Sequence, residues 1–373
     1  MDKHLHIITL DVPWPADYGG VVDMFYKIVH LHEQAVKIHL HCYTNGREPQ
    51  DELNKYCETV NYYTRSKKAA LQLMGLPYIV SSRSHQALLE RLRQDNYPVL
   101  MEGIHCTYLL HKGDLQNRKV FVRPHNVEFD YYRKLAEHES KIWKKLYYNI
   151  EAMLLKRYEK NIAGKATFWP LNVNDTLVFK GMAGNSAVDF LPLFVPWEAT
   201  APQSGKGCFC LYHGNLSVNE NEKAAAWLLT QVFNELSIPL VIAGKNPSPH
   251  LKQLAHVHKN TCLVANPSQQ EMQDLIKKAQ INILPSFNNT GVKVKILNAL
   301  FNGRYCLTNA AAIEGARLDK LCELAETPQE FREAIAALYE QPFSKEEAEV
   351  RASTLLATYN NTKNAAQLIQ WIF

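Results

Sequence analysis

The chain has 373 residues, which is too long for one typical domain and suits two. Its 41 Lys and Arg residues against 37 Asp and Glu give a net charge of +4, too weak to indicate a nucleic-acid partner by itself. No stretch approaches the ~20 apolar residues of a membrane-spanning helix, and the start, MDKHLHIITL, lacks the pattern of a signal peptide. The eight cysteines form no CxxC pair, which is typical of free thiols, so we expect a cytoplasmic protein.

The first predicted elements are a strand, a glycine-ended loop and a helix. Residues 5–10 predict the strand, DVPWPADYGG at 11–20 the loop, and an apolar stripe over 21–35 the helix. This layout places a phosphate or a sugar at the helix N-terminus, next to Gly19 and Gly20. The glycine pair is not a GxGxxG fingerprint, so a plain turn between strand and helix is the alternative.

Strands then alternate with helices through the first half of the chain. We expect strands over 37–44, 60–65, 97–103 and 119–126, with a helix over 84–94. The alternation favours a parallel α/β sheet, in which ligands bind beyond the carboxyl ends of the strands. The polar side chains that the pattern places at those ends are Glu102, His105, His125, Asn126 and Glu128.

Residues 129–163 predict one long basic helix with interleaved Tyr and Trp residues. Such a helix can lie on an anionic membrane surface. The other interpretation is a solvated helix face with charge pairs four residues apart.

Strands at 165–172 and 187–193 are expected to close the first half. A segment rich in Pro, Ser and Gly follows and indicates a linker. The last helix ends on Trp371, Ile372 and Phe373, so we expect it to pack on the first domain. The predicted boundaries are 1–195 for the N-terminal domain, 196–206 for the linker, 207–355 for the C-terminal domain and 356–373 for the last helix.

The second half repeats the α/β architecture. Ser268 and Glu271 indicate a capping box at the start of one of its helices. The expected strands are 207–215, 239–245, 261–267 and 281–286, and the first helix is expected over 219–236.

The stretch from Pro285 to Asn309 carries the strongest local pattern. A polar loop over 286–290 leads into a short amphipathic helix with Lys293 and Lys295 near its first turn. Cations there oppose the helix dipole by roughly 0.3–1 kcal/mol each, and a bound anion would reverse that sign. The pattern therefore indicates a cradle for a phosphate or diphosphate, with two solvated lysines as the alternative. The apolar face of the helix is predicted to contain Val292, Ile296, Ala299 and Leu300.

Fifteen histidines raise the question of a metal site. Pairs spaced as HxH occur, but they lack a third and a fourth ligand at a recognisable spacing, so we expect no metal. The pairs are His4/His6, His30/His32, His39/His41 and His256/His258.

Four segments resemble a known family in their order and spacing. They are DVPWPADYGG, then RPHNVEFDYYRKLA with YEKNIAGKATFWPLNVND, then LYHGNLSVNENEKAAAWLL, and finally GVKVKILNALFNGRYCLTNAAAIEG. Together they resemble a glycosyltransferase of GT-B architecture, similar to glycosyltransferase family 4. The resemblance covers nearly the whole chain and implies two Rossmann-like α/β domains that face a cleft, with the acceptor in the first and the donor in the second.

The resemblance also implies roles for individual residues. His125 matches a family histidine that contacts the sugar, and we expect it to be catalytic. Glu102, His105, Asn126 and Glu128 are expected near the acceptor or the sugar. Lys293 and Lys295 match a family Arg and Lys that neutralise the donor phosphates. The full set of implied donor-binding residues is Gly19, Gly20, Gly214, Asn215, Lys293, Lys295 and Asn298.

Asn298 departs from the family, which usually has a Glu there that accepts hydrogen bonds from the nucleotide ribose. An amide lacks the charge of that acceptor. The loop over 286–290 also lacks a second acid that the family carries. The alternatives are therefore a catalytically weakened GT-B protein that binds a sugar nucleotide or glycan or supports a partner enzyme, and an epimerase of the same architecture that would use Glu102 and Glu128.

The leading hypothesis is a retaining glycosyltransferase that uses neither a metal nor another cofactor. It would move a mannose- or glucose-like hexose from a nucleotide-diphospho-sugar to a glycan or lipid-linked acceptor in bacterial surface polysaccharide synthesis. Peripheral contact with the inner membrane face would give the basic helix a purpose, and no nucleic acid is expected as a partner.

Overall fold

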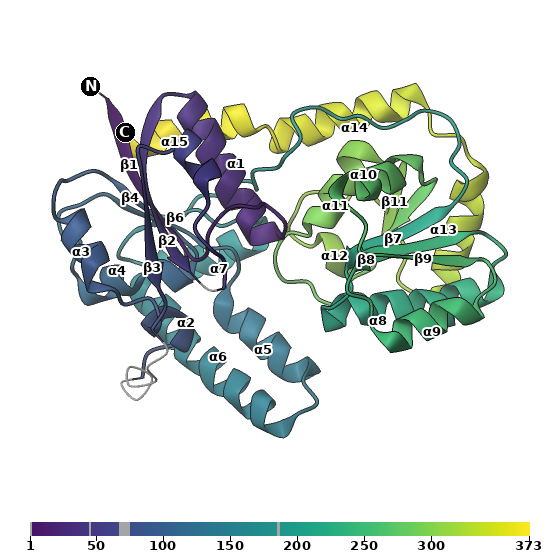
Figure 1. The fold of residues 1–373 in the computed structure, drawn as a ribbon, viewed down its shortest axis with the longest axis horizontal. Helices are drawn as coiled ribbons and strands as arrows, with labels where there is room; N and C mark the ends of the chain where they lie inside the picture. Colours follow the sequence, from purple (N-terminus) through teal and green to yellow (C-terminus); the bar gives the residue numbers. More distant parts are fainter. Residues whose placement is uncertain (1, 45, 67–74, 185–186) are drawn as a thin grey trace. The chain divides into compact units, whose positions relative to one another are not determined.

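The computed structural model describes residues 2–44, 46–66, 75–184 and 187–373, and it divides into two compact units (Figure 1). The first unit comprises Met1–Pro196 with Tyr359–Phe373, and the second comprises Trp197–Thr358. Each unit contains a six-stranded sheet whose paired strands are parallel. The predicted α/β class with two Rossmann-like domains is confirmed.

The sheet of the first unit has the strand order β3-β2-β1-β4-β5-β6. In this doubly wound order, β2 and β3 are added on one side of β1, and β4, β5 and β6 are added on the other side. The strands are β1 (Lys3–Thr9), β2 (Val36–Thr44), β3 (Thr59–Thr64), β4 (Val99–Glu102), β5 (Val120–Arg123) and β6 (Thr167–Phe168). The helices are α1 (Gly19–Glu33), α2 (Tyr78–Ser81), α3 (Gln86–Leu92), α4 (Tyr108–Lys112), α5 (Glu128–His138), α6 (Ile142–Ile162), α7 (Val173–Ala183) and α15 (Asn361–Ile372).

Both faces of this sheet are buried, since side chains that alternate along a strand enter two different apolar clusters, as Ile7 and Ile8 do. Ile7 pairs with Leu40 and with Leu100, and all three side chains belong to the core beneath α1. The same core receives Leu368 and Ile372 from α15, and Trp371 stacks on Trp169. The last helix therefore completes the core of the first unit.

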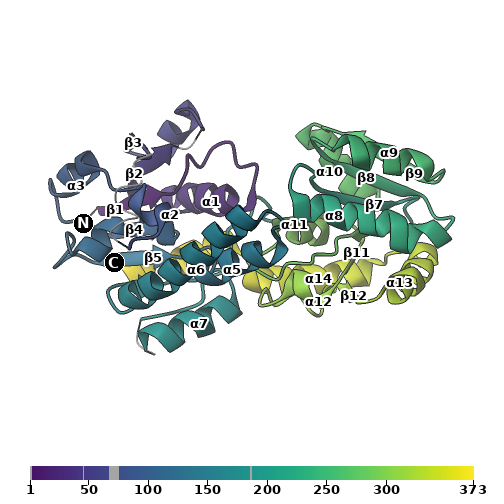
Figure 2. The ribbon, with the colours of Figure 1, turned by 90° about the horizontal axis from the view of Figure 1, so that it is seen from below.

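The long helix predicted over 129–163 is wrong, because the structure has two helices there. α5 ends at His138, α6 begins at Ile142, and the two run side by side (Figures 1 and 2). The backbone of Glu139 and Lys141 is extended, which breaks the helix. The strand predicted over 187–193 is also wrong, since Val188 makes only an isolated bridge to Phe168.

The second unit repeats the topology of the first, with the order β12-β11-β10-β7-β8-β9. Figure 1 shows α10 and α11 on one face of this sheet and α8 and α9 on the other. The strands are β7 (Cys210–Asn215), β8 (Leu240–Lys245), β9 (Thr261–Ala265), β10 (Ile281–Ile283), β11 (Tyr305–Thr308) and β12 (Glu323–Leu324). The helices are α8 (Asn219–Trp227), α9 (Pro249–Val257), α10 (Gln269–Lys278), α11 (Val294–Asn302), α12 (Ala310–Ile313), α13 (Pro328–Glu340) and α14 (Lys345–Thr358).

Two local predictions in this unit have clear outcomes. The capping box of Ser268 and Glu271 is confirmed, with both reciprocal hydrogen bonds formed. The single helix expected over 219–236 is wrong, because α8 continues into a π-helical turn over Leu228–Val232 and a 3₁₀ turn over Phe233–Glu235.

The segment predicted as a linker runs along the second unit. The N–H of Ala201 donates to the carbonyl of Phe301, and Gly205 bridges to Phe343.

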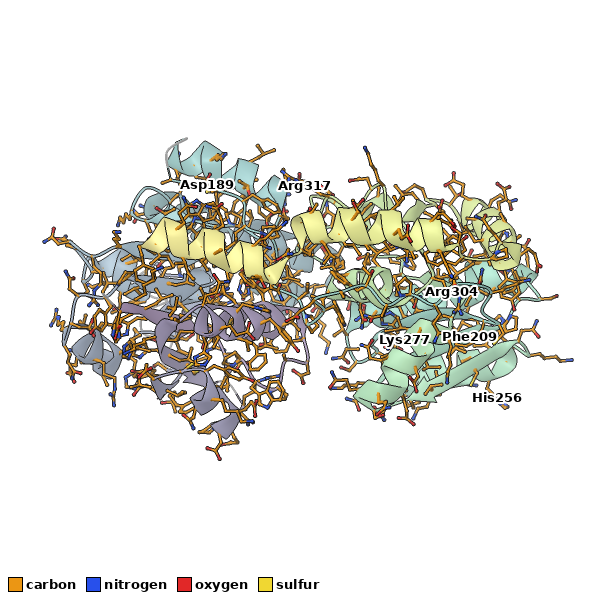
Figure 3. The ribbon with its side chains drawn as sticks, turned by 90° about the horizontal axis from the view of Figure 1, so that it is seen from above. Asp189, Phe209, His256, Lys277, Arg304 and Arg317 are labelled. Carbon is orange, nitrogen blue, oxygen red and sulfur yellow. The ribbon has the colours of Figure 1, made fainter. Side chains whose placement is uncertain are left out.

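Arg304 is buried and donates to the carbonyl of Lys277 (2.7 Å), which lies close to it in Figure 3. Arg304 thus stabilises the end of α10.

Among the described residues, no helix combines the length and the apolar character that crossing a membrane requires.

Candidate active site

The predicted site residues gather at the two places where the strand order reverses. In sheets of this type, ligands bind beyond the carboxyl ends of the strands at such a point. The reversal lies between β1 and β4 in the first unit, and between β7 and β10 in the second. His125 follows the adjacent β5, while Gly214 and Asn215 end β7.

His125 is held from two sides in the first unit. Its Nε2 lies 3.1 Å from Oε2 of Glu102, the last residue of β4. On the other side, a Cβ at Gly20 would lie 3.4 Å from Nδ1 of His125 and 3.3 Å from the ring of Tyr18. Glycine therefore lets the first turn of α1, which begins at Gly19, lie close against the imidazole.

A buried network of four charges supports Glu102. Lys27 Nζ lies 2.7 Å from Glu102 and donates to Asp23 at 2.8 Å, and Arg123 donates two hydrogen bonds to Asp23. All four side chains are fully buried, and their charges balance. A buried network of this kind is stable only when every member is paired, so it fixes the position of Glu102.

The network lowers the pKa of both carboxyl groups. Burial alone would raise the pKa of Glu102, but the charge of Lys27 and the hydrogen bond from His125 outweigh it. Burial is likewise outweighed at Asp23, mainly by Arg123 and Lys27. Both groups are therefore anions at neutral pH. Sequence reasoning missed Asp23, Lys27 and Arg123, although the i,i+4 spacing of Asp23 and Lys27 within an apolar helix was a readable signal.

Asp23, Glu102 and His125 are also the one group within the described ranges whose ligand atoms approach closely enough to hold a metal ion. In this arrangement the ammonium of Lys27 already lies between the two carboxylates. The two carboxylates are better suited to the ammonium of Lys27 than to a metal ion. An added cation would be repelled by Lys27 and Arg123 at close range.

Glu128 and Asn126 lie at the start of α5. Burial raises the pKa of Glu128 to about 8, although the side chain of Asn126 hydrogen-bonds to it. Glu159 of α6 accepts hydrogen bonds from the backbone N–H groups of Glu128 and Phe129, so it caps α5. His105 Nδ1 lies 3.9 Å from Glu128, beyond hydrogen-bond distance. Glu128 therefore belongs to a buried acidic pair with Glu159, whose pKa is also raised by burial.

A cavity of about 350 Å³ lies within the first unit beside this site. His105 and Tyr18 line it, and both lie near His125. Its size suits a small ligand. The other lining residues are Leu10, Asp11, Arg65, Tyr78, Ile79, Arg83, Tyr132 and Tyr147.

In the second unit, Gly214 and Asn215 are positioned by close backbone packing. A Cβ at the neighbouring Gly244 would lie 1.9 Å from the carbonyl oxygen of Gly214, so only glycine fits there. Asn215 accepts from Ser217, and its carbonyl accepts from Asn221 Nδ2 at 3.0 Å. These bonds shape the turn between β7 and α8.

The helix that carries the two lysines starts later than predicted. Val292 precedes it, Lys293 is its N-cap residue, and no side chain caps its first turn. The predicted apolar face is otherwise confirmed, since Ile296, Ala299 and Leu300 are fully buried. Lys293 Nζ donates to the carbonyl of Thr290 at 2.9 Å.

Lys295 points back to β7 and α8. Its Nζ donates to Asn221 Oδ1 at 3.0 Å and lies 5.0 Å above the ring of Tyr212, a cation–π distance. Burial lowers the pKa of Lys295 to about 8, with Lys293 adding to the effect and Glu220 opposing it. No carboxylate in the described ranges pairs with Lys295, so a bound anion would stabilise its charge.

Glu220 of α8 brings a carboxylate to the loop over 286–290, which contains no acidic residue of its own. Ser286 Oγ donates to Glu220 at 2.7 Å, and Lys293 Nζ lies 4.0 Å from the same oxygen. Sequence reasoning missed Glu220, because it comes from α8 and meets the loop only in three dimensions. Asn298 lies further along α11, where its Oδ1 accepts from Asn302 Nδ2 at 2.9 Å.

Comparison with known proteins supports the glycosyltransferase class that the sequence predicted. Residues 208–341 match the model of the family "Glycosyl transferases group 1". A protein from the cps region of Klebsiella pneumoniae, described as uncharacterized, is 28% identical over 328 residues, which span 83% of each chain.

Solved structures agree over almost the full length. Anabaena HepE, in complex with UDP and glucose, matches with a TM-score of 0.66 at 11% identity, over 99% of both chains. A TarM variant from S. aureus, in complex with UDP and other ligands, matches with a TM-score of 0.65 at 9% identity, also over 99% of both chains. The chain therefore has the GT-B fold and its second unit carries a glycosyl transferases group 1 domain, which confirms the predicted glycosyltransferase class.

Proposed function

We propose that this glycosyltransferase moves a hexose, mannose- or glucose-like, from a nucleotide-diphospho-sugar to a glycan or lipid-linked acceptor in surface polysaccharide synthesis. The observation that carries the proposal is the pair Lys293 and Lys295 at an uncapped helix start, where Asn221 connects Lys295 to Gly214 and Asn215. HepE and TarM were crystallised with UDP, and the Klebsiella relative lies in a cps region.

The second unit would hold the donor. Backbone N–H groups at the start of α11 and the two ammonium groups would stabilise the diphosphate as the bond to the sugar breaks. These residues supply positive charge from the chain itself, so we propose that the transfer needs no metal or cofactor. We propose retention of configuration at the sugar from the resemblance to glycosyltransferase family 4. Glu220 would accept hydrogen bonds near the nucleotide, in place of the acid that the loop lacks.

The first unit would hold the acceptor and contact the transferred sugar. His125 would bind a sugar hydroxyl, and Glu102 would orient the imidazole through its Nε2. The missing Cβ of Gly20 lets the start of α1 lie against His125, and the backbone N–H groups of Gly19 and Gly20 would bind an anionic group of the ligand there.

Peripheral membrane contact forms part of the proposal because α6 exposes apolar side chains. Trp143 is 83% exposed and Ile142 78% exposed. Lysines 141, 144 and 145 are exposed beside them. An exposed apolar stripe flanked by cations suits the interface of an anionic membrane. The stripe is formed by Ile142, Trp143, Leu146, Tyr147, Ile150 and Met153.

A thermal-shift panel with UDP, GDP, ADP and their sugar conjugates, with and without magnesium, tests the proposal. A donor at ~100 times its dissociation constant should stabilise the protein by ~2.7 kcal/mol. We expect one nucleotide class to raise the melting temperature without magnesium, and Lys293→Ala to abolish that rise. His125→Ala should keep the rise but lower the transfer rate, by about 100-fold for one lost transition-state hydrogen bond. A panel without any response would contradict the proposal.

The second candidate function is a catalytically weakened GT-B protein that binds a sugar nucleotide or glycan or supports a partner enzyme. Asn298 favours it, because the side-chain oxygen already accepts from Asn302 and carries no charge. Donor binding without any transfer to an acceptor would support this candidate.

A further inference from the structure

We propose that the cavity in the first unit binds an acidic sugar, with a carboxylate or phosphate group of the acceptor held by Arg65 and Arg83. This inference rests on the proposed function for the identity of the ligand as an acceptor. The cavity, its charges and its aromatic lining all belong to one unit.

The two arginines give the cavity an unbalanced positive charge. Arg83 is 3% exposed and donates only to backbone carbonyls, those of Leu10 and Ile79. Arg65 donates to Ser82 Oγ at 3.1 Å. In the part of the chain that the structure describes, neither guanidinium has a carboxylate within ion-pair distance. Each keeps free N–H groups, because a guanidinium has five.

The one carboxylate in the lining is already engaged. Asp11 Oδ1 accepts from the N–H of Val12 at 2.9 Å, and Oδ2 accepts from the hydroxyl of Tyr18 at 3.0 Å. Arg47, outside the lining, lies 3.8 Å from Asp11. Asp11 still acts on Arg83 through its charge, but one carboxylate offsets only part of the charge of two guanidinium groups. The lining therefore keeps a net positive charge that suits an anion.

Burial of Arg83 strengthens this conclusion. Burial, together with the nearby charge of Arg65, lowers the pKa of Arg83 to about 10. A buried cation without a counterion is costly, and such groups are normally paired. A planar carboxylate or a phosphate matches the fork of a guanidinium with two parallel hydrogen bonds.

The aromatic lining points to a sugar as the body of the ligand. Tyr18, Tyr78, Tyr132 and Tyr147 combine flat apolar faces with hydroxyl groups, so they can pack on a pyranose ring and hydrogen-bond to it. The imidazole ring of His105 forms part of the same wall. Tyr18 also borders Gly20 and His125, which connects the cavity to the proposed transfer site.

Binding calorimetry on the full chain tests the inference with methyl glucoside, methyl glucuronide and glucose 6-phosphate. We expect at least one anionic sugar to bind about tenfold tighter than the neutral one, because hydrogen bonds to charged groups are the stronger kind. The preferred anionic probe then tells whether the natural group is a carboxylate or a phosphate. Arg65→Gln should remove the preference, while Arg133→Gln, an exposed arginine on α5, should leave it unchanged.

Arg83→Lys serves as a second variant, because it keeps the buried charge but loses the fork, and it should reduce the preference. The thermal shift with the donor nucleotide must persist in Arg65→Gln, which separates loss of the cavity from loss of the donor site. Equal binding of all three sugars, or an anion preference that survives in both variants, would overturn the inference. A failure of donor binding in the unmodified protein would instead count against the proposed function alone.

Discussion

Arg123 holds Asp23 through two parallel hydrogen bonds, Nε to Oδ2 at 2.7 Å and Nη2 to Oδ1 at 2.8 Å, in a place fully shielded from water. Through Lys27, this pair also fixes Glu102 and hence the imidazole of His125. The Arg123–Asp23 pair therefore contributes both to the stability of the first unit and to the position of His125.

Arg123→Met should cost about 3–5 kcal/mol of unfolding free energy, because it leaves the buried Asp23 without its main partner. Urea unfolding measures the change. The matched control is Lys37→Met, which removes an ion pair with Asp2 at the surface, where little or no change in stability is expected. A cost for Arg123→Met as small as that of the control would contradict the structural role of the network.

Glu128→Gln should increase stability at alkaline pH. The pKa of Glu128 is raised by burial from 4.5 to about 8 in the folded protein. Because the folded state holds the proton more tightly, this group stabilises the fold in acid, and its contribution is lost as the pH rises from about 4.5 to about 8. The unfolding free energy of the unmodified protein should fall relative to Glu128→Gln by up to ~1.4 kcal/mol per pH unit in this window.

Unfolding curves of the two proteins at pH 5, 6.5 and 8 measure this difference. Glu137→Gln, on the exposed side of α5, is the control and should show no such trend. Parallel pH profiles for Glu128→Gln and the unmodified protein would show that Glu128 titrates normally.

Lys295 should take up a proton when a nucleoside diphosphate binds near pH 8.5. Its pKa of about 8 means that in most molecules the Lys295 side chain is neutral at this pH. A bound anion favours the charged form. Calorimetry in two buffers with different ionisation enthalpies measures the uptake. Lys295→Met should lose both the uptake and much of the affinity, whereas Lys278→Met, an exposed lysine of α10, should lose neither. Uptake that persists in Lys295→Met would assign the proton to another group.

The stripe on α6 should bind vesicles of phosphatidylcholine and phosphatidylserine. Lys144→Gln and Lys145→Gln should each weaken binding about fivefold, since one lysine near an anionic surface contributes about 1 kcal/mol. Trp143→Ser should weaken binding also to vesicles with less anionic lipid, because it removes apolar contact. Flotation measures both, with Lys252→Gln of α9 as the control. No flotation of the unmodified protein would remove the membrane contact from the proposed function.

Asn298→Glu should change the donor affinity by less than about twofold, because the side-chain oxygen of Asn298 has a second lone pair that can accept a hydrogen bond beside the one from Asn302. Calorimetric titration with the donor that the thermal-shift panel identifies measures the affinity. A gain of fivefold or more, the effect of about 1 kcal/mol, would favour the weakened protein over the active enzyme.

The sequence predicted the parts of the fold that depend on local pattern. The order of the strands, the capping box at Ser268 and the buried face of α11 follow from periodicity and from helix-start residues, whereas several strands end earlier than predicted. The break between α5 and α6 was missed, because residues 139–141 contain neither Gly nor Pro.

The site was predicted less completely, because its support comes from contacts between distant elements. Arg123 reads as the end of an apolar strand, yet it pairs with Asp23, which is 100 residues earlier in the chain. Glu220 reads as a surface acid of a helix start, yet it meets a loop 66 residues later. Single-sequence patterns report which face of an element is buried but not which charge it meets.

The return of α15 to the first unit has a consequence for how the protein is made. During synthesis, residues 197–358 emerge and can fold before the ribosome reaches the helix that closes the earlier core. At about 5–20 residues per second, that delay is roughly 10–30 s. Throughout this interval the apolar surface that Leu368 and Ile372 later cover stays open to water and to chaperones. The first unit to be translated is thus the last to be finished.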